Sequence, residues 1–168
     1  MLPLLTAASS FYVDARLPRP PHKRPISSKD DQVCFVNSAS SGVGSAAVQL
    51  AILHGYRGNH RTFSLLTILL VIGTSSPSNF DLVKSLGASD VFDYRDPDLV
   101  QKVKNAAGKK IDFAYDAAAT DSSIAASIEI LENKGTLMMV RPFIGNLDTK
   151  GVNVLPAFGD RVLVVILL

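Results

Sequence analysis

The feature that most constrains the fold of this chain is an apolar run that passes through a turn of small residues into a helix pattern. The apolar run is Val33–Asn37, the turn is Ser38–Gly44, and apolar side chains then recur at helical spacing as far as Gly55. A buried strand followed by small residues and a helix N-terminus presents main-chain N–H groups and the positive end of the helix dipole to a phosphate. The segment therefore predicts a dinucleotide-binding strand–turn–helix unit.

The turn itself carries part of a glycine-rich fingerprint. A full dinucleotide fingerprint has glycines in a G-x-G-x-x-G spacing, whereas serine and alanine occupy most of the turn here. Small side chains still allow the backbone to approach a diphosphate closely. We therefore expect the diphosphate of the cofactor to lie against Ser40, Ser41, Gly42, Val43 and Gly44.

With 168 residues, of which 47% are hydrophobic and 19% charged, the chain has the size and composition of one soluble globular domain. The net charge of +2 comes from interspersed acids and bases, so no dense basic face and no nucleic-acid partner are expected. Prolines interrupt the basic stretch 16–24, which favours a solvated linker over a patch for an acidic partner. The expected organisation is an N-terminal helix and proline-rich linker over 1–30 and a dinucleotide-binding domain over 31–168.

Cysteine and histidine usage gives no case for disulfide or metal chemistry. The single cysteine, Cys34, cannot form an internal disulfide and is typical of a reducing compartment, so a cytoplasmic location is expected. Its apolar neighbours indicate a buried, inert thiol rather than a nucleophile. The three histidines have no ligand spacing, so no metal site is expected. The apolar runs 65–72 and 162–168 are too short to cross a bilayer, and no membrane partner is expected.

Helix and strand patterns alternate along most of the chain, which predicts an α/β fold with a doubly wound parallel sheet and helices on both faces. From residue 141 onward the pattern is less regular, although 162–168 is compatible with one more strand. The expected helices are 4–13, 42–55, 79–86, 98–107 and 122–131, and the expected strands are 33–37, one within 71–76, 91–94, 111–115 and 136–140.

Several segments form an ordered series along the chain: 5–8, 17–21, 38–51, 75–88, 91–97, 111–116 and 135–137. In residue type and order they resemble the nucleotide-binding half of the zinc-free medium-chain dehydrogenase/reductases, especially the quinone-oxidoreductase-like and fungal trans-acting enoyl reductase members. The resemblance implies a Rossmann-like fold, NADP(H) as the cofactor, and hydride transfer to a small-molecule substrate such as an enone, an enoyl thioester or a quinone. No Ser/His/Asp or Cys/His nucleophile system can be assembled, so no catalytic residue is expected, and Asp116 is interpreted as a turn cap.

Ligands of such sheets bind beyond the carboxyl ends of the strands. No acid follows the second expected strand, where a carboxylate would select NAD by bonding the ribose 2′-hydroxyl and repelling a 2′-phosphate. By resemblance, the 2′-phosphate and the adenine ribose are held by Ser76, Ser78, Asn79 and Tyr94. A lysine that relatives often carry near Ser78 is absent. Two alternatives stay open, helix capping by Ser75–Asn79 and packing of Tyr94 on an edge strand.

The chain departs from the family between Gly55 and the second expected strand. Residues 58–70 are an insertion relative to family members and include the apolar stretch Phe63–Leu70. One hypothesis is a loop extension, a longer second strand or a short helix, which loop-closure entropy tolerates. The other is translated non-coding sequence, which transcript sequencing would refute by showing these codons in mature message.

Family members are considerably longer, because a GroES-like domain forms the other wall of their active-site cleft. Two interpretations therefore stay open, an NADPH-dependent reductase present as its cofactor-binding part and a non-catalytic NADP(H)-binding remnant. A flavodoxin-like module is a third class, which predicts that a flavin copurifies with the protein. Relatives often dimerise by joining sheet edges, so a homo-oligomer is an expected partner arrangement, and an apolar terminal segment such as 162–168 would need such cover.

Overall fold

The structure is a computed structural model that describes residues 2–14, 33–55, 70–132, 135–140 and 148–156. Its strands form one parallel sheet in the order β3-β2-β1-β4-β5-β6, which is the strand order of a dinucleotide-binding Rossmann fold. The strands are β1 Val33–Asn37, β2 Leu70–Ser75, β3 Asp90–Asp93, β4 Phe113–Asp116, β5 Thr136–Met139 and β6 Asn153–Pro156. The helices are α1 Leu2–Ser9, η1 Ser10–Asp14, α2 Gly42–Gly55, η2 Pro77–Asn79, α3 Phe80–Ser85, α4 Leu99–Ala107 and α5 Asp121–Ile130.

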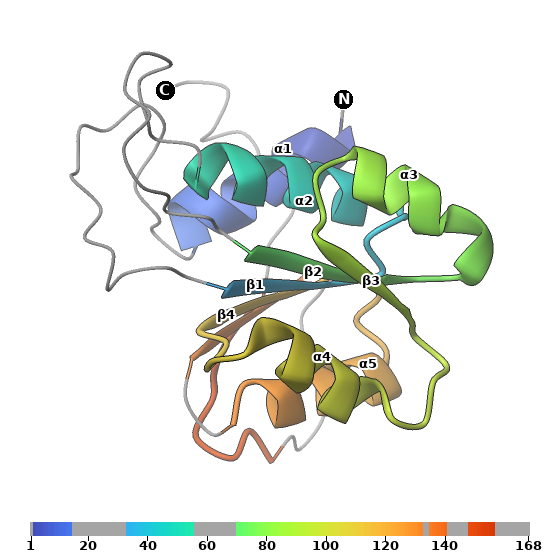
Figure 1. Ribbon diagram of the computed structural model, residues 1–168. Coiled ribbons are helices and arrows are strands. Elements are labelled where there is room, and N and C mark those ends of the chain that lie inside the picture. The colour runs from blue at the N-terminus through green and yellow to red at the C-terminus, as the bar shows by residue number, and fades with distance from the viewer. Residues whose placement is uncertain (1, 15–32, 56–69, 133–134, 141–147, 157–168) are drawn as a thin grey trace, which may run out of the picture.

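Helices cover both faces of the sheet, as the sequence predicts. In Figure 1, α1, α2 and α3 lie above the sheet, and α4 and α5 lie below it. Successive residues of β1 point to opposite faces, so Cys34 and Val36 join the core under α1 and α2, whereas Val33 and Phe35 join the core over α4 and α5. A strand buried on both faces has to be apolar throughout, which explains the continuous apolar run that opens the fold.

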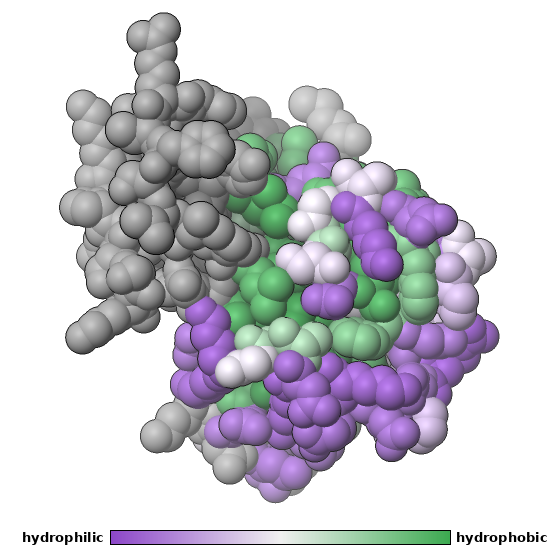
Figure 2. All heavy atoms as spheres, viewed as in Figure 1, coloured by the Kyte–Doolittle hydropathy of each residue, from purple (hydrophilic) through white to green (hydrophobic). Residues whose placement is uncertain are grey.

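The amphipathic helices have the expected orientation. On α4, Leu99 and Val103 are buried against the sheet, and Lys102 is exposed. Figure 2 shows hydrophilic residues over the part of the surface where α4 lies. On α3, Val83 is fully buried and Phe80 packs partly buried against the same core. Both helices therefore supply one apolar face to the sheet and one polar face to solvent.

Several element boundaries differ from the prediction by one or two residues, and in the strands described next the reason is pairing. The strand expected at 91–94 is β3 Asp90–Asp93, because β2 ends at Ser75, which pairs with Asp93, and Tyr94 has no neighbour to pair with. The strand expected at 111–115 is Phe113–Asp116, because its pairing with β1 begins at Phe113. Helices expected at 79–86 and 122–131 are α3 and α5, each ending one residue earlier.

Strand β6 was not predicted from the sequence. Asn153–Pro156 pairs in parallel with β5 at the edge of the sheet, and its residues are only half-buried or exposed. It therefore lacks the apolar run that identifies a central strand, and Pro156 at its end is tolerated because β6 is an edge. The possible strand at 162–168 lies outside the described residues.

The N-terminal helix belongs to the same core as α2. The helix expected at 4–13 is α1 followed by the π-helical turn η1, and it buries Ala7 and Phe11 in the core on that face of the sheet. The Phe11 ring stacks on the Tyr115 ring of β4, with centroids 5.6 Å apart. The Tyr115 hydroxyl donates to Ser10 Oγ at 3.2 Å, and burial raises the pKa of Tyr115 to about 12.

The segment 58–70, expected to be an insertion, meets the described structure at its last residue. Leu70 is the first residue of β2 and pairs with Val33 of β1. The second strand therefore includes Leu70, one residue before the range expected from the sequence. Residues 58–69 and the proline-rich linker lie outside the described residues. Within the described ranges, none of the helices has the length and apolar character needed to cross a membrane.

Candidate functional site

The turn that follows β1 is held tightly by its own residues. Ser38 has a φ of 59°, in the left-handed region. Ser41 Oγ donates to the Ser38 carbonyl oxygen at 2.8 Å and accepts from the Gly44 N–H at 3.1 Å, so Ser41 caps the N-terminus of α2. A Cβ on Gly44 would lie 2.1 Å from the Ser38 carbonyl oxygen. Glycine is therefore required at position 44 for the helix to start this close to the strand.

Three main-chain N–H groups of this turn have no partner among the described residues. The Ser38, Ala39, Ser41, Gly44 and Ser45 N–H groups all donate within the turn or to β2. The N–H groups of Ser40, Gly42 and Val43 do not, and these residues are exposed or half-buried. They lie at the N-terminus of the fourteen-residue helix α2, where the helix dipole favours a negative charge. The turn therefore offers donors and a positive potential to an anion.

A buried hydrogen-bonded pair fixes the turn to β2. The Ser38 N–H donates to Thr74 Oγ1 at 3.0 Å, and the Ala39 N–H donates to the Thr74 carbonyl oxygen at 2.8 Å. Thr74 Oγ1 in turn donates to Asn37 Oδ1 at 2.6 Å, and both side chains are buried. Neither residue is among the cofactor-binding residues predicted from the sequence. Two polar residues at the carboxyl ends of otherwise apolar strands were the signal that could have found them.

Asp116 at the end of β4 is a structural carboxylate. Its Oδ1 accepts from the N–H groups of Ala118 and Ala119, both at 2.9 Å, and its Oδ2 accepts from Ser123 Oγ at 2.6 Å. Asn37 Nδ2 reaches the Ser123 carbonyl oxygen at 3.4 Å, which ties α5 to the end of β1. The prediction that Asp116 caps the turn after the strand is confirmed.

A group of polar side chains follows the end of β2. Ser76 Oγ lies 3.1 Å from Ser78 Oγ and accepts from Asn79 Nδ2 at 3.1 Å. Neither the Ser76 nor the Asn79 side chain makes a capping hydrogen bond to the helices that follow. The capping alternative is thus wrong for these two side chains. They form instead a hydroxyl and amide cluster, here called the Ser76 cluster, of Ser76, Ser78 and Asn79.

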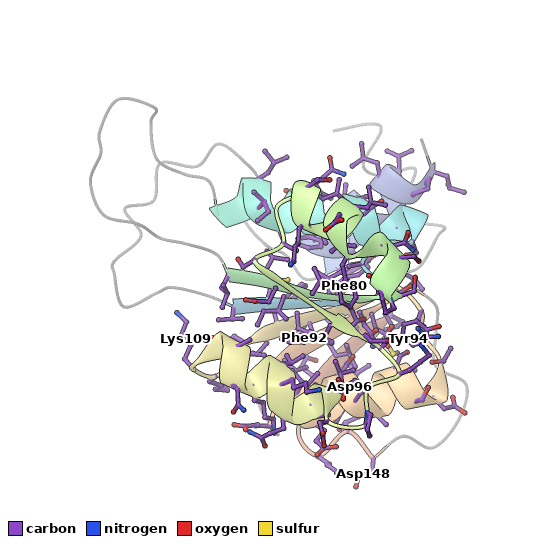
Figure 3. All side chains as sticks on the ribbon, turned by 45° about the vertical axis from the view of Figure 1, so that its right-hand side comes forward. Phe80, Phe92, Tyr94, Asp96, Lys109 and Asp148 are labelled. Atoms are coloured by element: carbon purple, nitrogen blue, oxygen red, sulfur yellow. The ribbon has the colours of Figure 1, made fainter. Side chains whose placement is uncertain are left out.

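Tyr94 follows the strand that pairs with β2. Ser75 pairs with Asp93, so Ser76 and Tyr94 follow two paired strand ends at the same edge of the sheet. The Tyr94 side chain is 55% exposed, so the alternative of a packed edge-strand aromatic is wrong. Figure 3 shows Tyr94 past the end of β3, whereas Phe92 lies on the α4 side of the sheet. The structure therefore gathers the turn, the Ser76 cluster and Tyr94 at the carboxyl edge of three neighbouring strands.

The described residues contain no sign of a metal site or an activated nucleophile. No group of three or more histidine, cysteine or acidic side chains in these ranges is placed to hold a metal ion. Cys34 is 3% exposed, and burial raises the pKa of its thiol to about 12. A thiol that stays protonated at neutral pH is a poor nucleophile, which confirms the interpretation of Cys34 as an inert core residue.

The chain matches the family model described as zinc-binding dehydrogenase over residues 65–158. The chain belongs to this family. The resemblance to medium-chain dehydrogenase/reductases is thereby confirmed. A zinc-type alcohol dehydrogenase-like protein of Schizosaccharomyces pombe is 32% identical over 133 residues, which are 79% of this chain and 34% of the relative. A trans-enoyl reductase of Gibberella fujikuroi is 39% identical over 101 residues, which are 60% of this chain and 25% of the relative.

This chain thus spans a quarter to a third of the length of these curated relatives. Solved structures agree with the fold. The CurK enoyl reductase superposes with a TM-score of 0.69 at 21% identity, covering 96% of this chain and 43% of that one. A quinone oxidoreductase of Pseudomonas syringae superposes with a TM-score of 0.66 at 23% identity, covering 95% of this chain and 45% of that one. Members of the family are pyridine-nucleotide-dependent oxidoreductases.

Proposed function

We propose that this chain is the NADP(H)-binding part of a zinc-free oxidoreductase that transfers hydride to an activated alkene or a quinone. The observation that carries the proposal is the set of N–H groups of Ser40, Gly42 and Val43 at the N-terminus of α2, which have no hydrogen-bond partner in the part of the chain that the structure describes. Ser41 and Gly44 shape the same turn by capping and by close packing. A diphosphate seated on this turn would accept from the three amides and lie at the positive end of the helix dipole.

The preference for NADPH over NADH is supported by the Ser76 cluster. Hydroxyl and amide groups can donate to a 2′-phosphate, and a carboxylate at the end of β2 would repel it. The residues that follow β2 in this structure are Ser76, Pro77, Ser78 and Asn79, with no acid among them. The carboxylate of Asp93 on the neighbouring strand is paired with Arg95. The exposed ring of Tyr94 is available to contact the adenine ribose from the other side.

The bound nicotinamide would supply the hydride, and the residues described here would bind and orient it. Donors on a fixed turn and a fixed cluster position a long cofactor at both ends, which lowers the entropy cost of aligning its reactive ring. The relatives include enoyl reductases and a quinone oxidoreductase by name, which supports an enone, enoyl thioester or quinone as the small-molecule substrate. The alternative is an NADP(H)-binding remnant without turnover.

We also propose that 1–30 comprise a helix and linker and 31–168 the nucleotide-binding domain, with 58–70 an insertion. A single, buried, free cysteine supports a reducing compartment such as the cytoplasm. An oligomer formed through a sheet edge is supported by the parallel edge strand β6.

Nucleotide titration of the full chain tests the binding proposal. We expect saturable binding of NADPH with a dissociation constant at least tenfold below that of NADH. Replacing Ser76 by alanine is expected to weaken NADPH binding selectively, whereas replacing Ser85, an exposed serine on α3 outside the cluster, is expected to leave both constants unchanged. Equal affinity for the two nucleotides would contradict the NADPH preference, and absence of binding would contradict the site.

Turnover separates the two interpretations. The full chain is incubated with NADPH and an enone or a quinone, and NADPH absorbance is followed at saturating nucleotide. Oxidation that requires both the protein and the acceptor supports the reductase. Binding without oxidation supports the NADP(H)-binding remnant. A flavin that copurifies with the chain would favour the flavodoxin-like class over both.

A further inference from the structure

Asn37 is the last residue of β1, at the point where the chain changes the face of the sheet on which its helices pack. From β1 the chain continues into α2 on one face, and from the neighbouring strand β4 it continues into α5 on the other face (Figure 1). Ligands of open α/β sheets bind at such a switch point, beyond the carboxyl ends of the strands. Asn37 is only 3% exposed, although it directly precedes the turn proposed to bind the diphosphate. A buried amide needs hydrogen-bond partners and thereby holds the elements that supply them.

The hydrogen bonds around Asn37 determine which way its amide points. Thr74 Oγ1 accepts from the Ser38 N–H at 3.0 Å, so its own hydrogen is free to donate to Asn37 Oδ1, which lies 2.6 Å away. The Ser123 carbonyl oxygen can only accept, and it lies 3.4 Å from Asn37 Nδ2. The amide oxygen therefore faces β2, and the NH₂ group faces the first turn of α5.

This single amide connects the residues from which two helices start. On the oxygen side, Thr74 links it to the N–H of Ser38, the first residue of the turn that leads into α2. On the NH₂ side, Ser123 lies in the first turn of α5, and its Oγ donates to Asp116 Oδ2 at 2.6 Å. The connection requires one acceptor and one donor on a side chain of this size. A leucine has neither group, and an ionised aspartate has two acceptors and no donor.

We propose that Asn37 is a positioning residue for nucleotide binding, whose neutral amide holds the turn after β1 against the start of α5. The three N–H groups proposed to bind the diphosphate thereby keep their arrangement. The inference rests on the proposed function, since the ligand is the nucleotide of that same site. An ionised carboxylate at position 37 would direct a second acceptor at the Ser123 carbonyl oxygen and add a negative charge next to a turn proposed to bind an anion. The absence of charge on Asn37 is thus part of its role.

The test measures the dissociation constants of NADP⁺ and NAD⁺ for the full chain and three variants between pH 5 and pH 8. Asn37→Leu removes both hydrogen bonds and should weaken the two nucleotides alike by ten- to a hundredfold, because the diphosphate is common to them. Asn37→Asp in its protonated form keeps an acceptor for Thr74 and an O–H donor for Ser123. Relative to the native chain, its dissociation constants should lie within about threefold at pH 5 and rise about tenfold or more by pH 8, as the carboxyl ionises.

The neighbours of position 37 favour the protonated form of an introduced carboxyl at low pH. Burial and the Ser123 carbonyl oxygen oppose ionisation, whereas the Thr74 hydroxyl supports it. The acids at this edge on the strands and helix that contact position 37 are Asp116 on β4 and Asp121 in the first turn of α5. Both are present in the native chain, so the ratio of variant to native dissociation constant at each pH cancels their titration and that of the 2′-phosphate.

Asn105→Asp is the matched control for the change of an amide into a carboxyl. Asn105 is exposed near the end of α4, and its amide oxygen accepts from Gln101 Nε2 at 2.8 Å. Helix α4 ends where the chain leads into the start of β4, at the edge of the sheet opposite the candidate site. The Asn105→Asp dissociation constants should therefore equal the native values at every pH.

The outcomes separate this inference from the proposed function. A native chain that binds neither nucleotide would overturn both. Native binding, together with unchanged dissociation constants in Asn37→Leu or a pH-independent ratio in Asn37→Asp, would overturn the role of Asn37 alone. Weakening of only one nucleotide would do the same. Urea unfolding gives the folded fraction of each variant, so a loss of stability with native affinity of the folded chain would also overturn it. If Asn37→Leu does not fold, the pH profile of Asn37→Asp decides by itself.

Discussion

Gly42 and Gly44 fit the glycine fingerprint of the turn equally well, but the structure requires a glycine only at position 44. An added Cβ on Gly44 would lie 2.1 Å from the Ser38 carbonyl oxygen and 2.9 Å from Ser41 Oγ. The nearest atom is backbone, and Ser38 is already in the left-handed region, so neither side of the contact can move without rebuilding the turn. By contrast, a Cβ on Gly42 would meet only the Pro3 side chain among the described residues, at 3.4 Å from its Cγ and 3.6 Å from its Cβ, which are ordinary contacts.

Replacement of Gly44 by alanine is therefore expected to lower the free energy of unfolding by about 1–3 kcal/mol. Forcing one extra carbon into a well-packed site costs that amount, and the helix propensity of alanine returns at most about 1 kcal/mol. At this chain length each kcal/mol lowers the melting temperature by roughly 2–4 °C. Because the clash displaces the turn, the loss of free energy of NADPH binding should be larger than the loss of free energy of unfolding.

Urea unfolding followed by circular dichroism, together with NADPH titration below the transition, measures both effects. Gly42→Ala is the control, and its unfolding free energy should stay within about 0.5 kcal/mol of the native value, as for a typical surface change. The reasoning would be refuted by a Gly44→Ala variant as stable as the native chain. Equal destabilisation by the two substitutions would refute it as well, since the geometry predicts a difference between them.

Three further predictions follow from buried polar groups. Thr74→Val leaves the Ser38 N–H and the Asn37 amide oxygen without their partner, so it should lower the free energy of unfolding by about 1–3 kcal/mol and weaken the binding of NADPH and NADH alike. Thr74→Ser keeps the hydroxyl and should retain both stability and binding. Urea unfolding and nucleotide titration measure the two effects, and a Thr74→Val variant with native stability and affinity would contradict the role of these hydrogen bonds. Burial raises the pKa of Tyr115 to about 12 from 10.0, so the unfolded chain loses this proton first and stability should fall as the pH rises from 10 to 12. Urea unfolding at these pH values should show a smaller slope in Tyr115→Phe, and an unchanged slope would speak against the burial effect. In Asp116→Asn an NH₂ group replaces one carboxylate oxygen, so either the Ser123 hydroxyl or the Ala118 and Ala119 N–H groups lose their acceptor. Thermal unfolding should therefore show a loss of about 1–3 kcal/mol in the free energy of unfolding. The stability of the surface variant Asp112→Asn should be unchanged.

The parts of the fold that depend on local pattern could be predicted from the sequence. Strand β1 has the predicted bounds, and α2 ends at Gly55 as expected, because an unbroken apolar run and a turn of small residues determine them locally. The exposure of Tyr94 could not be predicted, because it depends on where the neighbouring strand β2 ends. Strand β6 was missed for a related reason, since an edge strand is recognised by its neighbour rather than by its own apolar residues.

The polar network beneath the site is a second limit on prediction from the sequence. Asn37 and Thr74 are 37 residues apart in the chain, but Asn37 Oδ1 and Thr74 Oγ1 lie 2.6 Å apart in the structure. The sequence around either residue does not identify its partner, because polar residues at strand ends are common in turns. Only the pairing register of β1 and β2, which places Val36 opposite Gly73, brings the two side chains together.

That register connects the two halves of the candidate site. Strand β2 contributes Thr74, which holds the turn proposed to bind the diphosphate, and continues directly into Ser76, the first residue of the cluster proposed to bind the adenosine end. A slip of one residue along β1 would turn Thr74 toward the opposite face and shift Ser76 away from Tyr94. Leu70, the last residue of the proposed 58–70 insertion, pairs with Val33 and is the first residue on β2 that sets this alignment. The positions of the proposed diphosphate donors and of the proposed 2′-phosphate donors are therefore not independent: both follow from how β2 aligns with β1, and the pairing of β2 with β3 extends the same alignment to the end of β3, which Tyr94 follows.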